Sequence, residues 1–321
     1  MRVLVTGGAG YIGSTATAIL LERGFDVTVL DDCSTGHPDA VQGEAKFIEG
    51  SILDADVVAS ALSGCDAVLH FAAKSLVGES VEKPDLYHEV NVNGTKNLLD
   101  QMAIAKISKL VFSSTAATYG EPESIPITEE SKTKPTSPYG TTKLAVDQMI
   151  TEAAKSGLAA ISLRYFNVAG AFESKSGWLA ERHNPETHLI PNLLRSTPDS
   201  PIKIFGNDWP TKDGTCIRDY IHVVDLIDAH ILALEKLAPN EHRIINLGSG
   251  GGYSVTEVIN AAGKVVGKNI PIEITSRRAG DPAVLIADIS LASNFLNWKP
   301  RRDIENMVSD TWSAQNAANR K

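Results

Sequence analysis

The glycines near the start of the chain constrain its fold more than any other feature. A short apolar run leads into Gly7, Gly8, Gly10 and Gly13, and a helical pattern of apolar residues follows directly. The last three match G-x-G-x-x-G, and Gly7, Gly10 and Gly13 also match the wider G-x-x-G-x-x-G spacing. Glycine lets the backbone approach a phosphate closely, and the first amides of a helix bind anions. The stretch therefore predicts a strand, a phosphate-binding turn and a helix.

A carboxylate follows at a distance typical of a dinucleotide site. The next apolar run, 27–30, ends in Asp31 and Asp32, and Asp31 lies 18 residues after Gly13. An acid near this spacing accepts a hydrogen bond from the ribose 2′-hydroxyl of NAD. No Arg or Lys occurs between Asp31 and Lys46 that would bind a 2′-phosphate. These residues predict NAD rather than NADP as the cofactor.

The order of apolar patterns predicts the fold class. Runs typical of strands at 45–49, 67–71, 109–112 and 161–165 alternate with helical patterns, among them 54–62 and 86–102. This alternation predicts right-handed βαβ units and a Rossmann-type, doubly wound parallel sheet. We expect a Rossmann domain over residues 1–166, closed by the strand at 161–165, and a smaller C-terminal α/β substrate-binding lobe over 167–321, partly interleaved with it. In that lobe, helical patterns occur at 189–196, 223–236, 288–296 and 304–317.

Composition excludes several function classes. With 321 residues and a net charge of −9, the chain is not expected to bind nucleic acid or an anionic membrane surface. Its longest apolar stretches are too short to span a bilayer. Three cysteines lack metal-ligand spacing and cannot all pair, so we expect no metal and a reducing compartment. Met1 leads directly into the first strand without a signal peptide, and the expected location is the cytoplasm.

Tyr139 and Lys143 form a candidate acid–base pair. Ser137 and Pro138 are typical of a helix start, and residues four apart on a helix share a face. A neighbouring ammonium and a positively charged nicotinamide ring would favour the phenolate and lower the pKa of Tyr139 toward neutrality. Tyr139 is then a general base for a sugar or alcohol hydroxyl.

A group of small hydroxyl residues follows the strand at 109–112. Ligands bind beyond the carboxyl ends of the strands in an open parallel sheet. Hydroxyls placed there can hydrogen-bond a substrate hydroxyl and relay its proton. Thr115 is the candidate for this role.

Together, the glycine turn, the hydroxyl group and Tyr139-x-x-x-Lys143 resemble the extended short-chain dehydrogenase/reductase family. Stretches at 77–80, 91–95, 164–167, 205–208, 213–223 and 277–281 are similar to members of that family that epimerise UDP-hexoses at C4. The resemblance implies a UDP-sugar substrate and tightly held NAD, and it implies interconversion of UDP-galactose and UDP-glucose. Hydride leaves C4, the 4-keto sugar turns over, and hydride returns to its other face.

The resemblance also implies residue roles. Tyr139 deprotonates the 4-hydroxyl, Thr115 binds the 4-oxygen, and Lys143 holds the nicotinamide ribose and tunes Tyr139. The implied cofactor contacts are Gly7, Gly10, Tyr11, Ile12, Gly13, Asp31, Asp32, Ile52, Phe71, Ala72, Ala73, Asn91, Ser113, Tyr139, Lys143 and Phe166. The implied substrate contacts are Thr115, Tyr139, Asn167, His188, Leu189, Ile204, Phe205, Arg218, Tyr220, Arg278 and Asp281. Two arginines suit a diphosphate, which they neutralise through several hydrogen bonds.

Some positions depart from the family pattern and leave alternatives open. Ser51 stands where an Asp often contacts adenine, and we assign Lys74 no cofactor contact. Leu285 stands where residue size separates N-acetylated from plain sugars, so a 4-epimerase of UDP-N-acetylhexosamines or of another UDP-sugar is an alternative. A 4,6-dehydratase would need carboxylates where Ala116 and Ala117 stand. A non-catalytic, NAD-sensing regulator is the remote alternative. By family, we expect a homodimer through the helices at 86–102 and 139–154.

Overall fold

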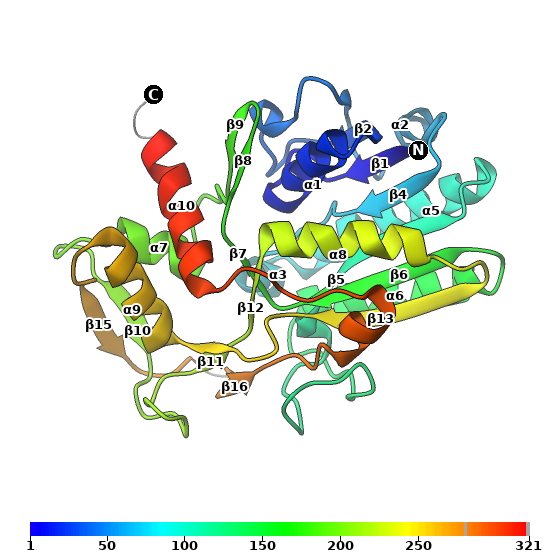
Figure 1. Ribbon diagram of the computed structural model, residues 1–321. Coiled ribbons are helices and arrows are strands. Elements are labelled where there is room, and N and C mark those ends of the chain that lie inside the picture. The colour runs from blue at the N-terminus through cyan, green and yellow to red at the C-terminus, as the bar shows by residue number, and fades with distance from the viewer. Residues whose placement is uncertain (279–280, 319–321) are drawn as a thin grey trace.

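A seven-stranded parallel sheet organises the structure, a computed structural model that describes residues 1–278 and 281–318 (Figure 1). Its strand order is β13-β6-β5-β4-β1-β2-β3, and every neighbouring pair is parallel. The strands are β1 (Arg2–Thr6), β2 (Asp26–Asp31), β3 (Lys46–Glu49), β4 (Ala67–His70), β5 (Lys109–Thr115), β6 (Ala159–Tyr165) and β13 (Glu241–Leu247). The order reverses between β1 and β4, which is the arrangement predicted for a Rossmann-type fold. That prediction is confirmed.

Helices cover both faces of the sheet (Figure 1). One face carries α1 (Tyr11–Glu22) and α8 (Val223–Lys236), whose apolar residues share one hydrophobic cluster with the sheet. A second cluster lies on the other face, with residues from α2 (Ala55–Leu62), α5 (Gly94–Ile104) and α6 (Pro138–Ala154). The two-sided cover explains why the strands read as nearly continuous apolar runs.

The sheet contains one strand more than the sequence predicted. The predicted series ended at the strand 161–165, but β13 pairs in parallel with β6 from Glu241↔Ala159 to Leu247↔Tyr165. The helix before β13, α8, also packs on the sheet. Elements from both halves of the chain therefore build the central layer, and a boundary at residue 166 stays a prediction.

The long helix predicted at 86–102 is interrupted. Residues 86–102 comprise the end of α4 (Pro84–Tyr87), the π-helical turn η2 (His88–Asn93) and most of α5, and a separate helix, α3 (Val77–Glu82), precedes them. A π-helical turn inserts an extra residue into a helix and is often found at functional sites. Here it places Asn91, whose side chain bonds the backbone N–H and C=O of Lys74 at 2.8 and 3.0 Å.

The rest of the chain forms small sheets beside three packed helices, at the left in Figure 1. The helices α7 (Leu189–Arg195), α9 (Val255–Val266) and α10 (Ile304–Ala318) share a third hydrophobic cluster. The strands are β7 (Asn167–Ala169), β8 (Phe172–Ser174), β9 (Gly177–Leu179), β10 (Ile202–Phe205), β11 (Ile217–Arg218), β12 (Tyr220–His222), β14 (Tyr253–Ser254), β15 (Ile272–Thr275) and β16 (Val284–Leu285). This agrees with the predicted small α/β lobe.

Three short helical turns complete the structure. They are η1 (Pro38–Ala40), η3 (Ala116–Thr118) and η4 (Ala292–Leu296). The helix predicted at 288–296 is thus shorter, whereas α8 matches its predicted bounds. Within residues 1–278 and 281–318, no helix combines the length and apolar character needed to cross a bilayer.

Candidate active site

The turn between β1 and α1 is a backbone cradle that fits a phosphate. Gly7 has φ +74°, and a Cβ there would lie 2.6 Å from the Ala72 nitrogen. A Cβ at Gly13 would lie 2.1 Å from the Gly7 carbonyl oxygen. The helix α1 begins after Gly10, and no side chain caps its first amides. These amides therefore remain available to an anion, and the residues present fit the pyrophosphate of NAD.

The predicted ribose carboxylate is held firmly at the end of β2. Asp31 accepts hydrogen bonds from the backbone nitrogens of Ala9 (2.9 Å) and Cys33 (2.8 Å). Burial raises the pKa of Asp31, and the two backbone donors oppose that shift. Asp32 accepts from the Ser34 nitrogen at 2.9 Å. Both acids line the cavity described next, as a ribose contact requires.

A cavity of about 1550 Å³ extends from the glycine turn to loops of the C-terminal lobe. The three predicted catalytic residues all line it. The predicted cofactor contacts that line it are Gly7, Gly10, Tyr11, Ile12, Gly13, Asp31, Asp32, Ile52, Phe71, Ala72, Ala73, Tyr139, Lys143 and Phe166. The cavity is also lined by the predicted substrate contacts Asn167, His188, Leu189, Ile204, Phe205, Arg218, Tyr220, Arg278 and Asp281. The fold thus gathers around one space the residues that spacing and the family resemblance selected.

Two predicted cofactor contacts lie behind the cavity wall instead. Asn91 is buried, and besides Lys74 it bonds the Thr142 hydroxyl at 3.1 Å. Ser113 is also buried, and its Oγ lies 3.1 Å from His230 Nε2. Both support residues that line the cavity, but neither is among the lining residues of the described chain.

The catalytic candidates converge from β5 and α6. Ser137 caps α6 by accepting from the Gly140 nitrogen at 3.1 Å, which places Tyr139 and Lys143 in the first two turns. Lys143 is 3% exposed, and its Nζ donates to the Ser113 carbonyl oxygen at 2.8 Å. Thr115 ends β5, and its hydroxyl acts on the pKa of Tyr139 as a hydrogen-bond partner. The phenol, the hydroxyl and the cation therefore all line the same cavity.

The protonation states differ from the sequence prediction. Burial raises the pKa of Tyr139 above that of a free tyrosine, and the hydrogen bond from Thr115 opposes this only in part. Lys143 is not among the groups that lower it, because burial also lowers the pKa of Lys143 to about 8, so its side chain is already neutral at the higher pH at which the buried phenol ionises. In the protein alone, Tyr139 is thus a protonated phenol. The positive ring of the cofactor is the remaining source of the predicted downward shift.

The other end of the cavity carries the two predicted arginines. Arg218 donates to the carbonyl oxygens of Ile217 and Pro282 at 2.9 Å, and its Nη2 lies 3.8 Å from Asp281 Oδ2. The guanidinium of Arg278 lies 3.7 Å from the centre of the Phe205 ring. The net charge of the protein is −9, but these two cations make this wall of the cavity positively charged. A positive wall suits a diphosphate.

Sequence reasoning missed the ion pair beneath the catalytic helix. Asp147 Oδ2 accepts from Arg164 Nε and Nη2 at 3.0 and 2.8 Å and from Ser114 Oγ at 3.1 Å. Asp147 also raises the pKa of Lys143, against the larger effect of burial. The signal was available, because Asp147 lies four residues after Lys143 on the same helix face.

Positions that departed from the family pattern lie at the margin of the site. Ser51 Oγ accepts from the Leu53 nitrogen at 3.2 Å, and Lys74 Nζ donates to Ser34 Oγ at 2.9 Å. Lys74 lines the cavity, whereas Ser51 and Leu285 do not within the described chain. Leu285 instead pairs with Arg218 across β16 and β11.

Comparison with known proteins relates this cavity to one enzyme family. Residues 3–248 match the family described as the NAD dependent epimerase/dehydratase family. The chain belongs to the NAD dependent epimerase/dehydratase family.

Relatives within the NAD dependent epimerase/dehydratase family match nearly the whole chain. The UDP-glucose 4-epimerase of Corynebacterium glutamicum is 53% identical over 323 residues, covering 99% of this chain and 96% of that protein. The UDP-glucose 4-epimerase of Brucella ovis, solved in complex with NAD, has a TM-score of 0.92 at 40% identity and 97% coverage of both chains. That of Stenotrophomonas maltophila, solved with NAD and formylated UDP-arabinopyranose, has a TM-score of 0.94 at 39% identity, covering 100% of this chain and 99% of that one. The predictions of an epimerase and of NAD as cofactor are confirmed.

Proposed function

We propose that the chain interconverts UDP-galactose and UDP-glucose and keeps NAD bound throughout the cycle. The observation that carries this proposal is the shared cavity, which brings the glycine turn, Thr115, Tyr139, Lys143 and the arginines together. A full-length relative that is 53% identical is named for this reaction. The chemistry also requires both halves of the cavity, one for a dinucleotide and one for a nucleotide-linked sugar.

In the proposed mechanism, NAD supplies the acceptor that takes a hydride from sugar C4 and gives it back. Tyr139 takes the proton of the 4-hydroxyl and later returns it to the 4-oxygen. Thr115 hydrogen-bonds that oxygen and orients it toward Tyr139. Lys143, charged below pH 8, favours the phenolate form of Tyr139 once the cofactor is in place.

Anchoring by the UDP group suits a reaction in which the sugar must present either face. Arg218 and Arg278 bind the diphosphate. Asn167 and Tyr220, which pair across β7 and β12, line the same cavity. The binding free energy then comes from the nucleotide, while the 4-keto sugar stays free to turn over.

We also infer a homodimer that works in the cytoplasm. Apolar side chains are exposed on α3, with Val81 64% exposed, and at the end of α5, with Ile104 73% exposed. Exposed apolar side chains at or beside the helix of the predicted interface support this inference. The three cysteines, Cys33, Cys65 and Cys216, are free thiols, which agrees with a reducing compartment. Light scattering of the purified protein tests the dimer, because a mass near 34.3 kDa would contradict it.

The variant Tyr139→Phe tests the catalytic assignment. It removes only the hydroxyl that moves the proton, so turnover is expected to fall by at least about 100-fold. UDP affinity, measured by calorimetry, should stay within about twofold, because the nucleotide contacts are unchanged. Tyr253→Phe is the matched control, since Tyr253 lies outside the cavity lining. Unchanged turnover in Tyr139→Phe would refute the role of Tyr139.

A further inference from the structure

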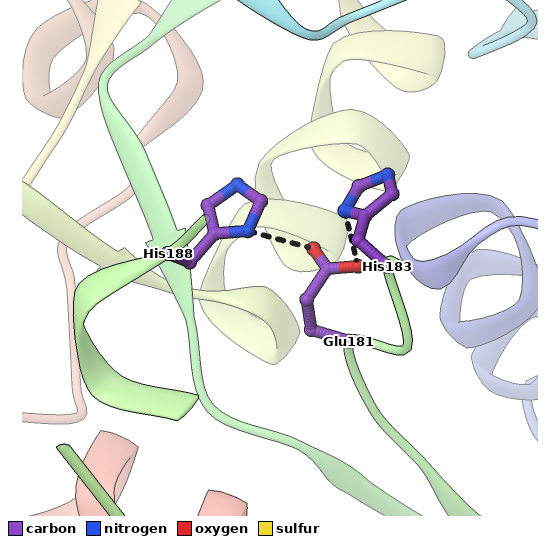
Figure 2. A group of neighbouring side chains, drawn as sticks. All are labelled: Glu181, His183 and His188. Carbon is purple, nitrogen blue, oxygen red and sulfur yellow. Dashed lines mark ion pairs between the residues drawn. The ribbon is translucent and has the colours of Figure 1, made fainter. Parts of the chain in front are cut away.

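A cluster of histidine and glutamate side chains lies on the segment between β9 and α7. Figure 2 shows Glu181 between His183 and His188, with its carboxylate facing both rings. Glu181 Oε1 lies 2.8 Å from His183 Nδ1, and Oε2 lies 3.9 Å from His188 Nδ1. One ligand atom from each residue lies within 4.8 Å of the others. All three residues also line the large cavity, away from Thr115, Tyr139 and Lys143 in sequence, and His188 is at the same time one of the predicted substrate contacts.

Two polar atoms in this cluster are buried without a hydrogen-bond partner. His183 Nδ1 faces Glu181 at 2.8 Å, but the two groups are not aligned as a hydrogen bond. The second is Oε2 of Glu186, whose side chain is only 4% exposed. The other oxygen of Glu186 lies 2.8 Å from His188 Nδ1. The buried oxygen Oε2 of Glu186 therefore costs free energy unless another group satisfies it.

Within the described residues, the two carboxylates of the cluster form ion pairs only with the two histidines. The side chains of Glu181 and Glu186 are 12% and 4% exposed. Arg182 lies between them in sequence, but its guanidinium bonds Asp39 at 2.8 and 3.0 Å. The rings of His183 and His188 stack with centres 5.4 Å apart. Two imidazolium ions this close would repel each other, whereas two neutral imidazoles beside one dication balance both carboxylates.

We propose that Glu181, His183 and His188, with Glu186 adjacent, bind one divalent transition-metal ion, for which Zn²⁺ is the probe. Imidazole nitrogen and carboxylate oxygen are the usual protein ligands of such ions. Ligand atoms in a tetrahedral zinc site lie about 3.4 Å apart, which falls between the observed 2.8 and 3.9 Å. The spacing Glu-x-His-x₄-His replaces the sequence expectation of no metal.

The ion has a structural role in this location. Its ligands come from a segment that joins the end of the β8–β9 hairpin to His188, the residue that precedes the first turn of α7. Glu181 and Glu186 both raise the pKa of Tyr11, so this segment lies close to the glycine turn. The ion therefore fixes a wall of the cavity without contacting the reacting atoms.

Metal content of the NAD-loaded protein tests the proposal. After treatment with EDTA, addition of Zn²⁺ and removal of excess ion, the wild type is expected to hold about one Zn²⁺ per chain. At a hundredfold excess over Kd, Zn²⁺ should raise Tm by about 5 °C. His183→Gln and Glu181→Gln should lose both effects, and His88→Gln is the control because His88 is exposed on η2. Equal zinc content in His183→Gln and the wild type would overturn the proposal.

A second measurement needs no variant. Crystals of the zinc-loaded wild type, measured at the zinc absorption edge, should give an anomalous peak about 2.1 Å from His183 Nδ1. A zinc-free wild type, or a peak elsewhere on the molecule, would show that the cluster consists of hydrogen-bonded His–Glu pairs alone and would reject the site.

Discussion

The side chains of the catalytic helix owe their properties chiefly to burial. Lys143 is 3% exposed, and the pKa of about 8 shows that removal from water outweighs the attraction of Asp147. The same burial raises the pKa of Tyr139. A buried cation held for function is expected to lower the stability of the fold that carries it.

Lys143→Met is therefore expected to stabilise the NAD-free protein while abolishing turnover. At pH 7 the buried charge opposes folding. Its removal should raise the free energy of unfolding by about 2 kcal/mol once the lost hydrogen bond to the Ser113 carbonyl has been subtracted. The penalty is full below pH 8, the folded pKa, and disappears as pH rises toward 10.5, the unfolded value. Urea unfolding at pH 7 and pH 10 measures both values. A variant less stable than the wild type at pH 7 would contradict this account.

Arg278→Ala tests the diphosphate contact. Loss of one charge-assisted contact made equally to substrate and transition state should raise KM for UDP-galactose about tenfold or more and leave kcat within about threefold. Arg277→Ala is the control, because Arg277 bonds Asp208 and stacks on Trp209 outside the cavity lining. Steady-state kinetics of both variants measure KM and kcat, and equal effects of the two variants would reject the assignment of Arg278.

Spacing and the family resemblance predicted which side chains line the cavity better than they predicted the layer behind them. Tyr139, Lys143 and Thr115 follow from helix and strand periodicity. Asn91 and Ser113 were predicted to contact the cofactor, but their side chains bond the chain's own residues. That distinction depends on which partners the tertiary fold supplies, and a single sequence does not contain it.

Among the elements, the turn between β1 and α1 has the least freedom to change. Gly13→Ala would place a Cβ 2.1 Å from the carbonyl oxygen of Gly7, which the turn holds by a hydrogen bond from the Gly10 nitrogen. We expect this variant to lose bound NAD and several kcal/mol of stability, because the helix must move away from the strand. Gly43→Ala, with open space around its Cβ, should retain both. Absorbance of released NAD and thermal unfolding measure the effects, and normal NAD content in Gly13→Ala would contradict them.

Elements with strong periodicity were predicted well, and those without it were not. The helix α8 matches its predicted bounds because ten of its residues are buried in a regular pattern. The strand β13 was missed because it begins Glu-His-Arg, and its fully buried residues come only at its end. The strands β11, β14 and β16 are two residues long, too short to show a period.

On the scale of the whole molecule, one buried carboxylate joins the sheet to the C-terminal lobe. Asp219 is fully buried between β11 and β12. It accepts hydrogen bonds from Ser249 Oγ and from the backbone nitrogens of Ser249, Gly250 and Ala287. Three segments far apart in the sequence therefore meet at a single side chain, a convergence that no local sequence pattern predicts.

Asp219→Asn should weaken this junction. The amide places a donor against backbone donors, so the expected loss is about 2–4 kcal/mol in the free energy of unfolding. Asp26→Asn is the control, because the Asp26 side chain is 72% exposed and its ion pair is long. Urea denaturation compares the two variants, and an Asp219→Asn protein as stable as Asp26→Asn would show that the junction is not important for stability.

The central claim is that one chain holds NAD and closes a complete redox cycle on a UDP-sugar. The most direct test is turnover of UDP-galactose by the purified protein with no NAD added, followed by chromatography of the sugar nucleotides. The account predicts formation of UDP-glucose, with the cofactor supplied by the protein itself. Absence of UDP-glucose, even after NAD is added, would contradict it and favour another UDP-sugar or a non-catalytic role.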